Sequence, residues 1–189
     1  MITVKQMERA WNARQYERVY RDLVAYRPEA TVTMDFESGW STPAAAMALI
    51  RMDELCQLHV PLFGKLLRAL LASQQTDGGW GDVATTALCL RALLCGEGHG
   101  LAVEQGLAFL ANLQKDNGLW PHCPPRRLPE DSRASAVVLY HLASQPAFVA
   151  SVRFEQAVAW FEANAMFLDE PTRALWAPTA RRCRYLQAA

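Results

Sequence analysis

An internal repeat constrains the fold of this chain more than any other feature of the sequence. Residues 74–80 have the form Q-x-x-x-G-x-W, and residues 114–120 have the same form 40 residues later. Upstream, Gly39-Trp40 matches Gly79-Trp80 at the same spacing. Downstream, Asp82 and Asp131 begin similar segments 49 residues apart, because nine extra residues fall within residues 121–130. We count about four units of 40 to 50 residues, the last of them degenerate. Periods of this length are typical of stacked structural repeats.

Each unit is predicted to contain two helices. Leucines at helical spacing run through residues 60–75, and the Asp-Gly-Gly that follows can end that helix. Asp82 and Asp131 are expected to be N-caps, each accepting a backbone N–H two or three residues later. No segment has the alternating, β-branched pattern of a strand. The sequence therefore predicts an all-α domain of about eight helices in four hairpins. The repeats cover residues from about 35 to 176. One predicted helix starts near Pro43, and the others span residues 3–27, 60–75, 83–95, 101–115, 131–144 and 151–167.

Composition excludes several classes of protein. Lys+Arg number 19 and Asp+Glu number 19, so a nucleic-acid coat or a polybasic membrane binder is disfavoured. No apolar run approaches the ~20 residues that span a bilayer, and the N-terminus lacks the apolar core of a signal peptide. Five scattered cysteines do not form a disulfide framework. We expect a cytoplasmic protein without a transmembrane segment or a nucleic-acid partner.

The repeat resembles a known superfamily. Q-x-x-x-G-x-W followed by Asp-x-x-Thr-x-Ala-Leu is similar to the QW repeat of squalene and hopene cyclases and to protein prenyltransferase β subunits, which are α/α toroids. The resemblance implies two layers of helices around an apolar central cavity. It also implies that the repeat residues are structural, with the glutamines bonded at helix ends and the tryptophans stacked on them. These residues are Gln74, Gly78, Trp80, Asp82, Gln114, Gly118 and Trp120.

The catalytic signatures of this superfamily are absent or altered. Class II cyclases protonate an alkene with an Asp-x-Asp-Asp motif, and the nearest candidates here are Glu130 and Asp131. Prenyltransferases hold zinc through Asp-x-Cys and a distant His, but Asp131 is followed by Arg133. Thioester domains need Cys-Gly-Glu-Gln, and Gly98 replaces that Gln after Cys95. We predict no cofactor and no metal.

Two functions from different classes remain. The first is a non-catalytic binding protein, whose apolar concave face holds an isoprenoid-like lipid or a partner protein. The alternative is a small terpene cyclase or prenyltransferase-like enzyme, with Glu130 or Asp131 as acid and Arg126 and Arg127 as diphosphate ligands. Six hairpins close the ring in the superfamily, so four leave it open or require a homodimer or a partner protein to complete it.

The inserted segment, residues 121–130, contains four prolines and is predicted to be an irregular loop at the mouth of the cavity. Insertions in repeat proteins often lie on the binding face. We therefore expect a ligand-binding role for four of its residues, with an idle surface loop as the alternative. These four are His122, Cys123, Arg126 and Arg127.

Overall fold

The computed structural model of the chain describes residues 41–96, 99–122 and 129–187. Contacts divide the chain into two compact units, Met1–Thr33 and Met34–Ala189, and all described residues belong to the second. The predicted helix over residues 3–27 and the upstream match at residues 39–40 lie outside the described residues.

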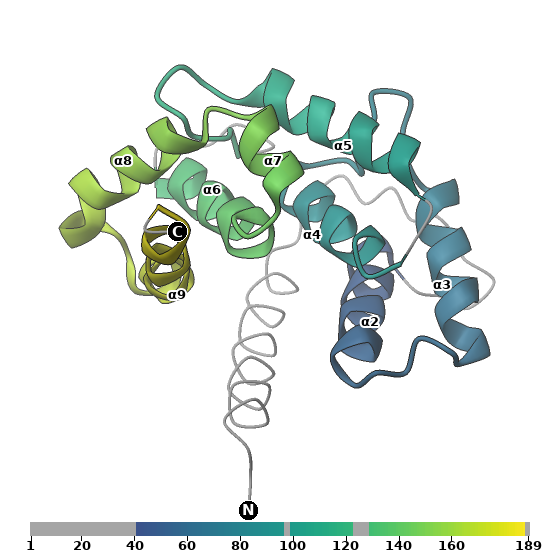
Figure 1. The fold of residues 1–189 in the computed structure, drawn as a ribbon. Helices are drawn as coiled ribbons and strands as arrows, with labels where there is room; N and C mark the ends of the chain where they lie inside the picture. The colour runs from purple at the N-terminus through teal and green to yellow at the C-terminus, as the bar shows by residue number, and fades with distance from the viewer. Residues whose placement is uncertain (1–40, 97–98, 123–128, 188–189) are drawn as a thin grey trace, which may run out of the picture. The chain divides into compact units, whose positions relative to one another are not determined.

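The described part of the chain is all-helical, which confirms the predicted fold class. Eight α-helices and one short 3₁₀ helix follow one another, and no strand occurs among these residues (Figure 1). In the same part of the chain, no helix is both long enough and apolar enough to cross a membrane. The elements are α2 (Thr42–Glu54), α3 (Pro61–Ala72), α4 (Val83–Leu93), α5 (Gly100–Leu113), α6 (Pro129–Leu142), α7 (Pro146–Ser151), α8 (Phe154–Asn164), η1 (Ala165–Phe167) and α9 (Glu170–Gln187).

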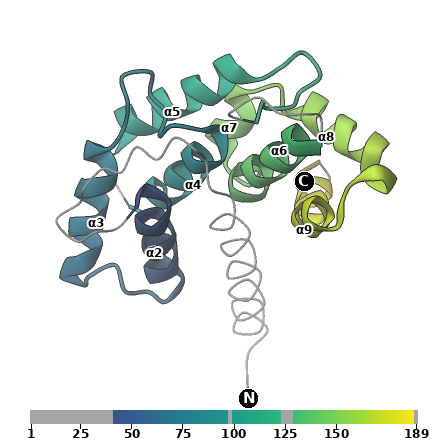
Figure 2. The same ribbon diagram turned by 180° about the vertical axis from the view of Figure 1, so that it is seen from behind.

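The helices of this unit lie in two rows. The central row consists of α2, α4, α6 and α9, in which each helix packs against the next. The flanking row consists of α3, α5, α7 and α8, which cover one side of the central row in both views (Figures 1 and 2). The chain alternates between the rows from α2 to α6, and the two flanking helices α7 and α8 then precede the central helix α9. A single helix of this kind cannot bury its apolar face alone, and stacking of successive pairs supplies the missing contacts.

The core lies within and between these rows. In α4 the side chains from Thr86 to Leu90 are all buried, and in α6 those from Asp131 to Leu142 are buried except Arg133. A helix that is buried on all sides needs apolar or hydrogen-bonded residues around its whole circumference. The sequence of α6 meets this requirement with alanine, valine and leucine, together with a few polar residues.

The prediction for the last third of the chain was wrong in part. The expected helix over residues 151–167 is interrupted at Val152, which is extended (φ −124°, ψ 168°). Pro146 begins the short helix α7 instead of only breaking the chain, since proline fits the first turn of a helix. Residues 170–187 form α9, which the sequence reading did not assign. Pro178 lies inside this helix and removes one backbone N–H, so the sequence around it does not look helical. The buried residues of α9 nevertheless recur at helical spacing. They are Thr172, Leu175, Trp176, Thr179, Ala180 and Cys183.

Candidate functional site

The two glutamines of the repeat make equivalent hydrogen bonds. In each turn the glutamine Nε2 donates to the carbonyl of the glycine four residues later, at 2.8 Å in both. Gln74 Nε2 also donates to the carbonyl of Ala102 in the first turn of α5, at 2.9 Å. Gln114 Nε2 donates to the carbonyl of Arg153, the N-cap of α8, at 3.2 Å, and its Oε1 accepts the Arg153 N–H at 2.7 Å. Each glutamine therefore links its turn to the start of a later flanking helix, which is α5 for Gln74 and α8 for Gln114.

The two tryptophans also occupy equivalent places. Trp80 Nε1 donates to the carbonyl of Leu70 at 2.9 Å, and Trp120 Nε1 donates to the carbonyl of Leu110 at 2.8 Å. Both acceptors lie ten residues before the tryptophan, in the last turn of the preceding flanking helix. Trp120 is fully buried and stacks on Phe148, with the ring centroids 6.0 Å apart. Stacking of the tryptophans on the glutamines stays a prediction.

The motif glycines are required by both backbone conformation and space. Gly78 and Gly118 have φ values of +88° and +83°, in the left-handed region that L side chains rarely adopt. A Cβ on Gly78 would lie 2.5 Å from the carbonyl oxygen of Gln105 in α5, and one on Gly118 would lie 2.5 Å from the backbone nitrogen of Ala157 in α8. The turns therefore pack directly against the backbone of the flanking helices.

The fourth residue of each turn is a position that the motif did not capture. Asp77 Oδ1 accepts the Gly79 N–H at 2.9 Å, and Asn117 Oδ1 accepts the Leu119 N–H at 3.1 Å. Asp and Asn share this ability to bond the backbone two residues later. The signal was available, because Asp77 and Asn117 are also 40 residues apart.

Trp176 is not a further repeat of this turn. The sequence pairs Leu175-Trp176 with Leu119-Trp120 as a weak echo, but Trp176 lies inside α9 and stacks on Phe161, with centroids 4.8 Å apart. Trp80 and Trp120, in contrast, lie in the turns before α4 and α6. The hydrogen-bonded repeat is thus found at two places in the described residues.

Asp82 is the predicted N-cap. Its Oδ1 accepts the N–H groups of Ala84 and Thr85, both at 2.9 Å, and its Oδ2 accepts the Thr85 hydroxyl at 2.7 Å. Next to this cap, Thr86 Oγ1 accepts the backbone N–H of Trp80 at 2.9 Å. The cap and the turn before it are therefore fixed together.

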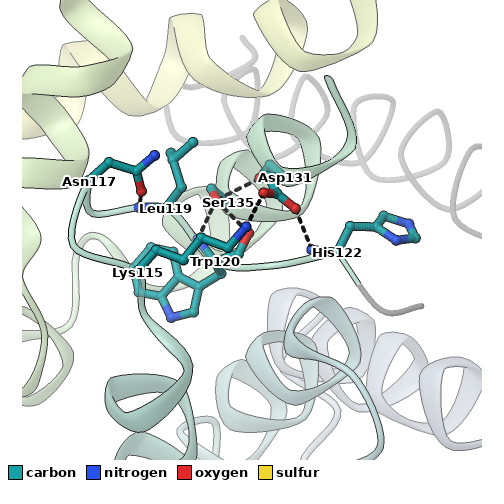
Figure 3. Close-up of polar contacts among 7 residues, drawn as sticks. All are labelled: Lys115, Asn117, Leu119, Trp120, His122, Asp131 and Ser135. Atoms are coloured by element: carbon teal, nitrogen blue, oxygen red, sulfur yellow. Dashed lines mark hydrogen bonds and ion pairs between the residues drawn. The ribbon is translucent and has the colours of Figure 1, made fainter. Parts of the chain in front are cut away.

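Asp131 is not an N-cap, and this part of the prediction was wrong. Helix α6 begins two residues earlier, at Pro129, because proline can occupy the first turn of a helix. Asp131 Oδ1 instead accepts the backbone N–H of His122 at 2.8 Å, and Oδ2 forms an ion pair with Lys115 (Figure 3). The Asp131 side chain thus connects the second repeat turn to α6. The corresponding link at the first turn is absent, because Gln75 stands where the second turn has Lys115.

The predicted ligand-binding residues are only partly described. His122 is buried, and its ring extends away from the Asp131 carboxylate (Figure 3). Glu130 lies in the first turn of α6, and its side chain is outside the described part of the structure. Cys123, Arg126 and Arg127 lie outside the described residues altogether. The structure therefore brings Asp131 together with the backbone of His122, and it does not test the others.

A second polar cluster, whose residues the sequence reading did not bring together, lies where α6 packs against α4 and α9. Arg182 Nη1 donates to the carbonyl of Tyr140 at 3.2 Å, and its guanidinium carbon lies 5.3 Å from the centre of the Tyr140 ring. Burial, followed by the charges of Arg91 and Arg182, lowers the pKa of the neighbouring His141 from 6.5 to about 3. Burial also raises the pKa of Tyr140, although Arg182 opposes that shift.

Cys95 lies beside the same cluster. Burial is the main reason that its pKa rises from 9.0 to about 12, and the nearby Asp53 also raises it, while Arg91 opposes the shift. Arg91 Nη1 lies 3.2 Å from the Cys95 sulfur. A thiol of this kind is protonated at neutral pH and is a poor nucleophile. Among the described residues, no group of three or more His, Cys, Asp or Glu side chains could hold a metal ion.

Comparison with known proteins gives no further assignment. No protein-family model, no curated protein and no solved structure matches the chain.

Proposed function

We propose that the chain is a non-catalytic binding protein, a partial α/α toroid that holds an isoprenoid-like lipid against the central row of helices. The observation that supports this proposal most is that the polar groups of the motif residues are hydrogen-bonded within the protein. The glutamine amides, tryptophan N–H groups and Asp82 carboxylate all bond to the backbone or side chains of the protein itself. Residues used in this way form a frame and are not available to a substrate.

The best acid candidate supports the same proposal. Cyclase-type chemistry requires a protonated carboxylic acid that can give its proton to an apolar substrate. Both oxygens of Asp131 instead accept, one from the His122 N–H and the other from the Lys115 ammonium. This arrangement suits an ionised carboxylate with a structural role.

The proposal places the apolar ligand at the face of the central row that points away from the repeat turns. Thr86 of α4 and Ser135 of α6 both contact the repeat tryptophans, so they point toward the turns. At 100° per residue, Leu88 and Val137 lie on the opposite sides of these two helices. Both are buried, so a ligand that reaches them must enter with a local opening of the packing.

Native mass spectrometry of the purified protein after incubation with a lipid extract tests the proposal. We expect a bound species of isoprenoid mass that survives buffer exchange. A homodimer or a complex with a partner protein in place of a lipid would show that another macromolecule occupies the face, and the lipid proposal would then fail.

A further inference from the structure

Exposed apolar side chains gather at the two ends of the helix rows (Figures 1 and 2). Seven large apolar side chains are exposed among the described residues, and five of them lie between α2 and α3 or between α8 and α9. Leu55, Leu58 and Leu62, from the turn before α3 and its first residues, are 41% to 51% exposed. Met166 and Phe167 of η1 are 89% and 86% exposed. Exposed apolar groups of this size indicate a surface that another molecule covers.

The charges beside these apolar residues have opposite signs at the two ends. From residue 55 to residue 76 the sequence contains Lys65 and Arg68 and no acidic residue. From residue 154 to residue 172 it contains four acidic residues and no basic one. We call the first surface the basic patch and the second the acidic patch. The basic patch consists of Leu55, Leu58, Leu62, Lys65 and Arg68, and the acidic patch consists of Glu162, Met166, Phe167, Asp169 and Glu170.

Most of these charges have no ion-pair partner within the described ranges. Lys65 and Arg68 are exposed, lie three residues apart on one face of α3 and form no ion pair there. Glu162 and Glu170 are likewise exposed and unpaired in that part of the chain. The nearest basic residue in sequence, Arg173, donates from Nη2 to the carbonyl of Leu168 at 2.6 Å. Each patch therefore combines exposed apolar groups with charges that the described chain does not balance.

From these observations we propose that the chain associates head to tail, with the basic patch of one copy bound to the acidic patch of the next. A second copy offers what each patch lacks, which is an apolar surface together with charges of the opposite sign. Because the two patches are different surfaces, the contact is heterologous, and a dimer still has one free patch of each kind.

This inference does not rest on the proposed function. None of the patch residues belongs to α4 or α6, where the lipid is proposed to bind. A copy bound at the patches should therefore leave a lipid in place.

Sedimentation velocity over a range of protein concentrations tests the inference, with a reducing agent present because Cys56 is exposed next to Leu55. We expect the average mass of the parent to rise with concentration beyond that of a dimer. Leu58→Asp alters the basic patch and Phe167→Asp alters the acidic patch, and each should weaken self-association at least about tenfold. The matched control is Leu101→Asp, at a residue of α5 that is 71% exposed and outside both patches, and it should associate like the parent.

Mixing the two patch variants gives the sharpest result. Leu58→Asp retains the acidic patch and Phe167→Asp retains the basic patch, so an equal mixture should form a dimer of one copy of each and nothing larger. Raising the salt concentration from about 0.1 M to about 1 M shortens the screening length from about 10 Å to about 3 Å. It should weaken association of the parent about fivefold, the effect of two exposed ion pairs.

Each other outcome overturns the inference. A monomer at every concentration shows that no second copy covers the patches. Loss of association in only one patch variant shows a symmetric dimer, and a mixture that stays monomeric shows that the patches do not bind each other. Equal loss in Leu101→Asp shows a general effect of added charge. Circular dichroism checks that each variant is folded, and the salt series needs no variant, so salt-independent association of the parent also overturns the inference.

Discussion

Replacing each repeat tryptophan with phenylalanine compares two turns that share the Q-x-x-x-G-x-W motif but differ in what else bonds to the carbonyl that accepts the indole N–H. Phenylalanine keeps an aromatic ring and removes the indole N–H. In the first turn the Leu70 carbonyl also accepts the Ser73 hydroxyl at 2.8 Å and the Ser73 N–H at 3.2 Å. It therefore remains hydrogen-bonded in Trp80→Phe.

The second turn has Leu113 where the first has Ser73, so no side-chain hydroxyl can take the place of the indole N–H. The N–H of Gln114, which could have bonded to the Leu110 carbonyl in a continuing helix, donates to Ala111 instead. Trp120→Phe therefore leaves a buried carbonyl in the last turn of α5 without its indole donor. A buried polar group that loses its partner costs about 1–3 kcal/mol, whereas the net value of an ordinary hydrogen bond is about 0.5–1.5 kcal/mol. Both variants lose similar ring volume, so that cost cancels in the comparison.

Urea denaturation of the parent and both variants measures this difference. We expect Trp120→Phe to lower the free energy of unfolding by about 1 kcal/mol more than Trp80→Phe does. Circular dichroism at zero urea checks that each variant is folded. An equal loss in the two variants, or a larger one in Trp80→Phe, would refute the reasoning that the Leu110 carbonyl depends on the indole.

Three further predictions concern other parts of the frame. In the same urea assay, Gly118→Ala should lower the free energy of unfolding by about 2–5 kcal/mol, because Gly118 has a positive φ and the added Cβ meets the backbone of α8. Gly81→Ala should lower it by about 1–2 kcal/mol, because Gly81 has φ +94° but no atom lies within 4 Å of the added Cβ. Asp82→Asn should leave the free energy of unfolding nearly unchanged, because Asn caps a helix as well as Asp. Asp131→Asn should lower it by about 1–3 kcal/mol, because it removes the charge that pairs with Lys115. Equal losses in the two variants would contradict this difference. His141 binds its proton near pH 6.5 when unfolded and near pH 3 when folded, so the unfolded state gains protons first as the pH falls. Relative to His141→Gln, the folding equilibrium constant should fall about tenfold per pH unit between pH 6 and pH 4, and parallel pH profiles would contradict a buried neutral histidine.

The sequence predicts the frame well because its signal is local and repeated. Gln74 and Gln114, with their glycines and tryptophans, are spaced by 40 residues, and in the structure each glutamine makes the same hydrogen bond to its motif glycine. Local rules also predicted the cap at Asp82. Asp131 shows the limit of such rules, since two additional residues at the start of α6 moved it from the cap into the helix.

The polar cluster could not be predicted in this way. Arg91, Tyr140 and Arg182 belong to three helices that are far apart in the chain, and only the packing of α6 against α4 and α9 brings them together. In the sequence, Arg182 appears as one of several arginines near the C-terminus. Its distinction is its place over the Tyr140 ring, which depends on tertiary contacts alone.

The central claim is that the chain binds an isoprenoid-like lipid without transforming it. The most direct test is to incubate the purified protein with farnesol and, separately, with farnesyl diphosphate, isolate the protein by gel filtration, and identify the recovered isoprenoid by mass spectrometry. We expect farnesol to co-elute chemically unchanged, and farnesyl diphosphate to show no turnover in the parent or in Asp131→Asn. Failure of farnesol to co-elute would contradict the binding claim. A cyclised or transferred product formed by the parent and lost in Asp131→Asn would show an enzyme instead.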